Sequence, residues 1–188
     1  MASRHLMNLK QAHTMFSLLK SDPLLKGAIK EYNVPFPMNK QKKEKRAPAY
    51  YTCIINMLTA YAFTTKNTIS KIDWDPHHLA TYSDKHGNLL FTSSRRFDGA
   101  IPSLYNPRII WEIKEYYYTT SFGSRVADGV YETQLDGFEL NQLKEKHGIN
   151  IHHVFLIDAY DTWWGKGKSY LCRIFDALNQ GAVDEVLF

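Results

Sequence analysis

Three side chains that could do chemistry stand close together in the middle of the chain. Asp98 is followed, after a gap of 13 residues, by Glu112 and Lys114, which lie inside the apolar stretch IIWEIKEY at 109–116. Ile, Trp and Tyr favour β-strands, whereas Glu and Lys are depleted there. An ionised carboxylate is also costly to bury without a partner. A strand of this composition therefore predicts a nearby group that compensates its charge.

Strand geometry indicates which of these side chains meet. Residues two apart on a strand share a face, so Glu112 and Lys114 point the same way. If this strand pairs as a hairpin with the one before it, Asp98 lies beside Glu112. Two adjacent carboxylates repel each other, and a hard divalent cation such as Mg²⁺ (or Mn²⁺ in its place) relieves the repulsion and also holds phosphate. Lys114 can then orient or deprotonate a water that attacks phosphorus.

Hydrophobic periodicity predicts the elements that must position these residues. The first third of the chain is typical of helices, and the remainder alternates between strands and helices. The expected helices span 5–20, 22–32, 48–63, 125–147 and 168–180, and the expected strands span 88–97, 97–103, 108–120, 149–160 and 183–188. From residue 47 onward the order is α-β-β-β-α-β-α-β, which favours an α/β fold with a mixed β-sheet flanked by helices.

Composition narrows the class of protein. The chain has 188 residues, 44% of them hydrophobic, which is enough for one domain with an N-terminal helical extension (1–46) and a core (47–188). No apolar run approaches the roughly 18 residues of a membrane-spanning helix, so no membrane partner is expected. Two cysteines, Cys53 and Cys172, provide neither a disulfide framework nor a zinc site. They predict a reducing, cytoplasmic setting with both thiols in the core.

Charge is distributed unevenly along the chain. Residues 1–97 contain 15 Lys and Arg against 6 Asp and Glu, whereas residues 98–188 contain 8 against 13. A basic half is typical of proteins that bind a polyanion, although a merely solvated basic surface has the same composition. The candidate DNA contacts are Lys42, Lys43, Lys45 and Arg46 in one basic run, Arg95 and Arg96 beside Asp98, and Arg125 and Gln134 on the helix after the charged strand.

The same residues resemble those of a known nuclease family. Asp98 followed by Glu112-Ile113-Lys114 is similar to the PD-(D/E)xK motif, with Phe97 where the family has proline. The stretches FDGAI and WEIKEYYYTTSFGSRVADGVYETQLDGFE resemble the cleavage domains of Type IIS restriction endonucleases, and the likeness covers about residues 47–160. The resemblance implies a restriction-endonuclease-like core that hydrolyses DNA phosphodiester bonds. It also implies Mg²⁺ bound by Asp98, Glu112 and the Ile113 carbonyl, with Lys114 as the catalytic lysine.

The resemblance also implies partners. The N-terminal extension is small for an independent domain that reads DNA sequence. Some Type IIS enzymes are heterodimers in which a large subunit recognises the site and nicks one strand, and this chain resembles their small catalytic subunit. Double-stranded DNA and a larger recognition and nicking subunit of a restriction-modification system are then its expected partners. A self-sufficient homodimeric restriction or repair endonuclease, and a catalytically silent DNA-binding or assembly protein of the same fold, are the alternatives.

Other patterns are weaker. DTWWGKGKS at 161–169 imitates a phosphate-binding loop, but Thr162 stands where the Walker pattern requires glycine. DKHGN at 84–88 hints at a ββα-metal nuclease, without a second histidine pattern to support it. Trp163 and Trp164 are expected to form a packing or partner surface. Glu115, on the opposite strand face from Glu112, has no predicted role.

Overall fold

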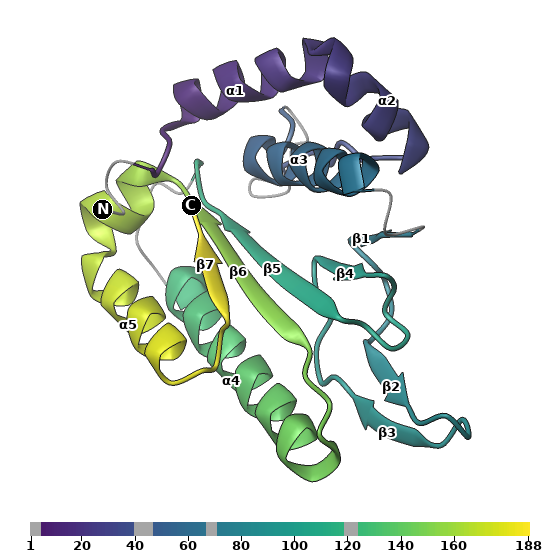
Figure 1. Ribbon diagram of the computed structural model, residues 1–188. Coiled ribbons are helices and arrows are strands. Elements are labelled where there is room, and N and C mark those ends of the chain that lie inside the picture. Colours follow the sequence, from purple (N-terminus) through teal and green to yellow (C-terminus); the bar gives the residue numbers. More distant parts are fainter. Residues whose placement is uncertain (1–4, 40–46, 67–70, 119–123) are drawn as a thin grey trace.

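A five-stranded mixed β-sheet forms the centre of the computed structural model, which describes residues 5–39, 47–66, 71–118 and 124–188 (Figure 1). The strand order is β1-β4-β5-β6-β7. The strands are β1 (Asp73–Trp74), β4 (Gly99–Ile101), β5 (Ile109–Glu115), β6 (His152–Asp158) and β7 (Glu185–Leu187). The pairs β1–β4 and β4–β5 are antiparallel, whereas β5–β6 and β6–β7 are parallel. The predicted α/β fold with a mixed sheet and helices on both faces is confirmed.

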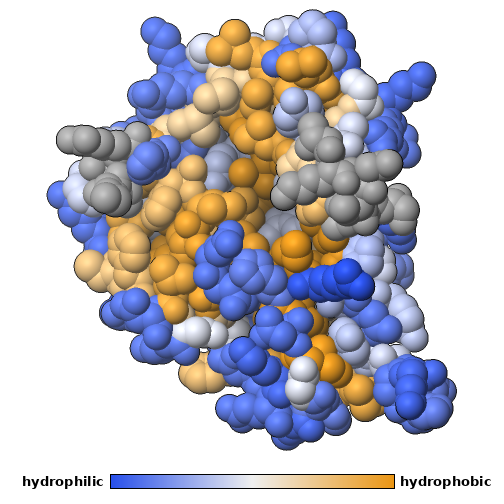
Figure 2. Space-filling model, viewed as in Figure 1, coloured by the Kyte–Doolittle hydropathy of each residue, from blue (hydrophilic) through white to orange (hydrophobic). Residues whose placement is uncertain are grey.

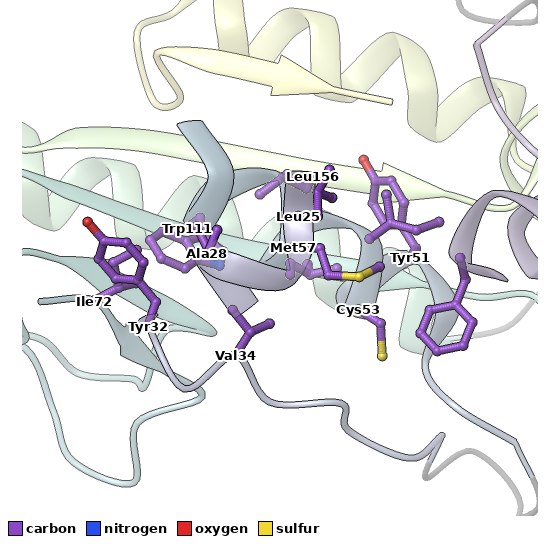
Figure 3. Close-up of a cluster of buried hydrophobic side chains, with 14 of the residues drawn as sticks. Leu25, Ala28, Tyr32, Val34, Tyr51, Cys53, Met57, Ile72, Trp111 and Leu156 are labelled. Carbon is purple, nitrogen blue, oxygen red and sulfur yellow. The ribbon is translucent and has the colours of Figure 1, made fainter. Parts of the chain in front are cut away.

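Three N-terminal helices cover one face of the sheet (Figure 1). They are α1 (Leu9–Ser21), α2 (Pro23–Glu31) and α3 (Tyr50–Lys66). A capping box between Asn8 and Gln11 begins α1, and Asp22 caps α2 ahead of a proline at the first helical position. Figure 3 shows Leu25 of α2 and Met57 of α3 gathered with Leu156 of β6 in one buried cluster. The helices of the predicted extension are therefore a layer of the same core.

Two further helices cover the opposite face. They are α4 (Ser124–His147), which connects β5 to β6, and α5 (Lys168–Asn179), which connects β6 to β7. Val126 of α4 and Ile174 of α5 share a buried cluster with Phe155 and Ile157 of β6. A short π-helix, η2 (Asp161–Lys166), precedes α5 and buries Trp163 completely. Packing is thus confirmed as the role of that tryptophan.

Side chains of β5 alternate between the two faces. Trp111 and Ile113 belong to the cluster under α1–α3, whereas Ile110 belongs to the cluster with Leu140 of α4. The register places Gly99 of β4 directly opposite Trp111. A Cβ at position 99 would lie 1.9 Å from the Trp111 ring, so only glycine fits beneath the indole. Glu112 and Lys114 therefore project from β5 on the face that α4 covers.

The first of the expected strands, at 88–97, is assigned wrongly from the sequence. Residues 88–97 contain only a short strand, β3 (Leu89–Thr92), which pairs with β2 (Thr81–Ser83) in a separate two-stranded sheet. The strand that completes the central sheet is β1, which is too short for its periodicity to be recognised. Apolar residues alone favour strand formation, but they do not determine which sheet a strand joins.

The surface departs from expectation at one cysteine. Cys53 is buried as predicted, but Cys172 is exposed, so the prediction that both thiols lie in the core is wrong for Cys172. The buried residues of α5 are Leu171, Ile174 and Ala177, which leaves position 172 on the outer face. Figure 2 shows hydrophobic side chains over the upper and left parts of the viewed face and hydrophilic ones along its margins and across its lower part. Within the described ranges, no helix combines the length and the apolar character needed to cross a membrane.

Candidate active site

Asp98 is fixed against β5 at the point where β4 begins. Its backbone N–H donates to the Trp111 carbonyl at 3.0 Å, and its carboxylate Oδ2 accepts a hydrogen bond from the Ile113 N–H at 2.7 Å. Since Gly99 lies opposite Trp111, Asp98 is the neighbour of Glu112 across the hairpin. The expectation that this hairpin brings the two carboxylates together is confirmed.

Lys114 supplies a first counter-charge to the strand. Its ammonium forms an ion pair with the Glu112 carboxylate, and these two side chains are 15% and 16% exposed. A second carboxylate approaches from α4, because Oε2 of the half-exposed Glu132 lies 3.7 Å from Lys114 Nζ. The Lys114 ammonium thus lies near the carboxylates of both Glu112 and Glu132, and the carboxylate of Asp98 lies next to Glu112.

The site holds more carboxylate than its ammonium neutralises. Burial and the charge of Asp98 raise the pKa of Glu112 to about 8, although Lys114 opposes the shift. Burial also raises the pKa of Asp98, against the hydrogen bond from the Ile113 N–H. For Lys114, burial disfavours the charged form, but the carboxylate of Glu112 outweighs it and the pKa rises. A cation placed between the two carboxylates would favour the ionised form of both.

A cleft of about 560 Å³ opens beside these residues. Asp98, Ile113 and Lys114 contribute to its lining, whereas Glu112, held by Lys114, does not. The wall also includes Asp75, whose backbone N–H donates to the Asp98 carbonyl at 2.8 Å and whose charge raises the pKa of Asp98. Sequence reasoning missed Asp75 because it follows a two-residue strand and shares no spacing with the motif.

The chemistry of the donors fits a hard divalent cation. Asp98 and Glu112 offer carboxylate oxygens of the kind that Mg²⁺ and Mn²⁺ prefer. The Ile113 N–H points to the β4 side, and the carbonyl of the same residue points to that side as well, opposite the residues that precede the start of β4. Among the described residues, no group of three or more His, Cys, Asp and Glu side chains is arranged to hold a metal. Glu112 would therefore exchange its bond to Lys114 for the ion.

Of the candidate DNA contacts, Arg95 is engaged within the fold. Its Nη2 lies 2.5 Å from Oδ1 of the buried Asp136 and donates to the Glu132 carbonyl at 3.0 Å. Burial raises the pKa of Asp136 to about 6, and Arg95 opposes that shift. Arg96 is exposed, with Nη1 3.3 Å from His77 Nδ1 at the cleft. Arg96 is thus the arginine of the pair with a surface position.

The remaining candidates divide between α4 and undescribed segments. Gln134 is half-buried on α4, two residues after Glu132, so the two side chains leave the helix on different faces. The structure therefore brings Glu132, and not Gln134, to Lys114. Arg125 belongs to α4, but its side chain lies outside the described part of the structure. Lys42, Lys43, Lys45 and Arg46 also lie outside the described residues.

Glu115, the third charge of the strand, has a separate partner. Its Oε2 accepts hydrogen bonds from the Thr52 N–H at 3.0 Å and the Thr52 hydroxyl at 3.1 Å, in the first turn of α3. Burial raises the pKa of Glu115 to about 7 in spite of these bonds. A carboxylate at a helix N-terminus is stabilised by the helix dipole. Glu115 thus joins β5 to α3.

Local structure accounts for the two weaker motifs. DTWWGKGKS forms η2 and the start of α5, and both Thr162 and Trp163 are buried there. DKHGN is the turn of the β2–β3 hairpin, in which Gly87 has a φ of 84° and Asp84 binds the N–H groups of His86 and Asn88. Neither segment needs a phosphate or a metal to explain its residues.

Comparison with known proteins identifies one family. The model of a family described as a domain of unknown function (DUF7687) matches residues 7–188. No match is found among curated proteins or among solved structures.

Proposed function

We propose that this chain, which belongs to the DUF7687 domain family, is a Mg²⁺-dependent endonuclease that hydrolyses DNA phosphodiester bonds. The observation that carries the proposal is the arrangement of three side chains at one end of the β4–β5 hairpin. Asp98 is hydrogen-bonded to the Ile113 N–H at 2.7 Å, and Glu112 and Lys114 form an ion pair beside it. Two carboxylates, a lysine and a strand carbonyl beside a cleft are a set that can support metal-assisted phosphodiester hydrolysis.

The arrangement of elements supports a restriction-endonuclease-like core. Leaving out the β2–β3 hairpin, the order from α3 to β6 is α3-β1-β4-β5-α4-β6. This order agrees with the α-β-β-β-α-β pattern that the motif resemblance implies. The antiparallel part of the sheet carries Asp98, Glu112 and Lys114, and the parallel part receives the crossover through α4.

The chain's own residues have distinct tasks in this proposal. Asp98 is held by the Ile113 N–H, so its carboxylate is oriented before any ligand arrives. When bound, Mg²⁺ supplies positive charge that stabilises the negative charge developing on the phosphate. Lys114, on releasing Glu112, has a free ammonium with which to orient the attacking water or contact the phosphate. The cleft wall at Asp98 and Lys114 is where the scissile phosphate would lie.

A larger recognition subunit completes the proposal. Helices α1 and α2 pack with α3 in the cluster that covers the sheet, so they form no separate DNA-reading domain among the described residues. We therefore propose that a restriction-modification system supplies a second, larger subunit that recognises the site and nicks one strand, while this chain cuts the other. Purified alone, the chain should nick plasmid DNA weakly and without site preference.

Cleavage and metal binding by matched variants test the activity. We expect Mn²⁺ binding, measured by electron paramagnetic resonance, and Mg²⁺-dependent nicking of supercoiled plasmid by the wild type. Asp98→Asn and Lys114→Met should each lower the nicking rate by on the order of 100-fold or more, and only Asp98→Asn should also weaken Mn²⁺ binding. Glu145→Gln, an exposed carboxylate on α4, is the control and should match the wild type.

Two outcomes would overturn parts of the proposal. A wild type that neither binds Mn²⁺ nor nicks plasmid, or an Asp98→Asn variant that does both as well as the wild type, rejects the nuclease and favours the silent DNA-binding alternative. Efficient site-specific double-strand cutting by the lone chain, with a dimer in sedimentation, rejects the recognition subunit and favours the homodimeric alternative.

A further inference from the structure

Helix α4 has a glycine where it faces the candidate catalytic lysine. Gly129 lies in the second turn of a 24-residue helix, and glycine is a poor helix former in such a position. Gly129 is buried, and its carbonyl accepts a hydrogen bond from the Thr133 hydroxyl at 2.9 Å, one helical turn further on. A residue with a Cβ would suit the helix better, so the reason for glycine lies in what packs against it.

The groups that pack against Gly129 are the ends of two side chains, Lys114 of β5 and Tyr116 just after it. A Cβ at position 129 would lie 3.0 Å from Lys114 Cε, 3.2 Å from Lys114 Cδ and 3.1 Å from the Tyr116 hydroxyl. These separations are tighter than ordinary van der Waals contact. The lysine stem and the tyrosine hydroxyl therefore occupy the space that a side chain at 129 would need.

Other contacts restrict the same two side chains. The Tyr116 ring packs against the buried Trp163 with ring centroids 5.7 Å apart, and the Tyr116 N–H donates to the Asp158 carbonyl at 3.2 Å. Glu132, one helical turn after Gly129, approaches Lys114 Nζ at 3.7 Å. Lys114 is thus bounded by the backbone and a carboxylate of α4, and by an anchored tyrosine that directly follows β5.

We propose that Gly129 and Tyr116 are positioning residues for Lys114. The missing side chain at Gly129 leaves room for the lysine stem, and the Tyr116 hydroxyl limits the movement of that stem, so in the metal-free protein the ammonium stays against Glu112. The functional importance of this arrangement rests on the proposed nuclease activity. The arrangement itself is a property of the chain that can be measured without DNA or metal.

The test compares Gly129→Ala with Gly27→Ala. Gly27 is also a helical glycine, in α2, but a Cβ there meets nothing within 4 Å. Both substitutions improve helix propensity, and the atoms that a Cβ meets at 129 belong to side chains and not to the backbone. Neither variant should therefore have a lower urea midpoint than the wild type. The readout is the acetylation rate of Lys114 at fixed pH, measured by mass spectrometry of the metal-free protein, with the exposed Lys144 as internal reference.

Gly129→Ala should raise the acetylation rate of Lys114 at least threefold relative to Lys144, because the methyl group displaces the ammonium from Glu112. It should also lower the rate constant of plasmid nicking at least tenfold at unchanged DNA affinity. Gly27→Ala should change neither quantity. Tyr116→Phe, which removes only the hydroxyl, should raise Lys114 acetylation at least twofold with a urea midpoint near that of the wild type.

The proposal would be overturned if Lys114 of Gly129→Ala were acetylated at the wild-type rate, or if the acetylation rate of Lys144 rose by the same factor. If Gly129→Ala does not fold, Tyr116→Phe decides, and unchanged acetylation there overturns it as well. Failure of the nuclease is recognised separately. In that case Lys114 acetylation responds as expected, but the wild type shows no Mg²⁺-dependent nicking.

Discussion

The charges of β5 are compensated by different interactions on the two faces of the strand. On the α4 face, Glu112 pairs with Lys114, and Glu132 lies 3.7 Å from the same ammonium. On the α3 face, Glu115 is buried and accepts two hydrogen bonds from Thr52 in the first turn of α3. One face therefore keeps a charged group that a ligand can recruit, whereas the other uses a carboxylate to join two elements.

The position of Glu115 makes stability depend on pH. Burial raises its pKa from 4.5 to about 7, so the folded state holds a proton more tightly than the unfolded state. The stability contributed by protonation is fully present below about pH 4.5 and is lost as the pH rises to about 7, by up to about 3 kcal/mol. Glu115→Gln cannot ionise, so its free energy of unfolding should fall less between pH 5 and pH 7 than that of the wild type.

Urea denaturation at pH 5 and pH 7 measures this effect. Asp158, whose pKa is raised by burial to about 6, contributes a slope of the same sign, so the slope should shrink rather than vanish. The control is Glu145→Gln at an exposed position, which should retain the wild-type slope. Identical slopes in the wild type and Glu115→Gln would contradict the burial of an ionisable Glu115.

Among the elements, α4 holds the segment that precedes Asp98. The Ser94 N–H donates to Glu139 Oε2 at 3.1 Å, and Arg95 pairs with Asp136 at 2.5 Å. The same helix brings Glu132 to within 3.7 Å of Lys114. Because α4 contacts the segment before β4 and the lysine of β5, its position controls how the two strands present the candidate catalytic groups.

A double-mutant cycle tests Arg95 as part of this connection. Arg95→Met leaves Asp136, whose side chain is 6% exposed, without its partner and should cost about 2 kcal/mol of unfolding free energy. The double variant Arg95→Met with Asp136→Leu should be less destabilised than the sum of the single changes, because no buried charge is left unpaired. Urea denaturation measures each corner of the cycle.

DNA affinity distinguishes this role from the one predicted from sequence. An internal Arg95 predicts that, at low salt, the cycle's variants bind DNA as the wild type does. A loss of DNA affinity in Arg95→Met at unchanged stability would instead identify Arg95 as a DNA contact. Arg96, which is exposed beside His77 at the cleft, is the matched position for comparison.

At the scale of the whole molecule, the helices of the basic and the acidic parts of the chain lie in different layers. Helices α1–α3 belong to the basic residues 1–97, and α4 and α5 belong to the acidic residues 98–188. These two groups of helices cover opposite faces of the sheet (Figure 1). The lysines of α1 and α2 (Lys10, Lys20, Lys26 and Lys30) therefore lie in the layer opposite α4 and α5.

Salt dependence of DNA binding tests the basic run 40–46. If Lys42, Lys43, Lys45 and Arg46 contact phosphates, replacing all four with Gln should reduce the slope of log K against log salt by about 3 to 4. The control replaces Lys144 and Lys146 at the end of α4, which belongs to the acidic half, and should leave the slope unchanged. An unchanged slope in the fourfold variant would identify the run as a solvated segment.

The sequence by itself determined the features that depend on neighbours along the chain. Alternation put Glu112 and Lys114 on one face of β5, and Asp22 followed by proline located the start of α2. The helix expected at 125–147 is α4 at Ser124–His147. These predictions hold because side-chain direction and capping are decided within a few residues of each position.

Tertiary structure alone decided which distant groups meet. It placed β1, and not residues 88–97, in the central sheet. It paired Arg95 with Asp136 and brought Glu115 within hydrogen-bonding distance of Thr52. It also brought Gly129 against Lys114 and Tyr116. Local patterns state what a side chain prefers, such as burial or a counter-charge. Which partner satisfies that preference depends on how the layers pack around the sheet, and no short-range pattern records that packing.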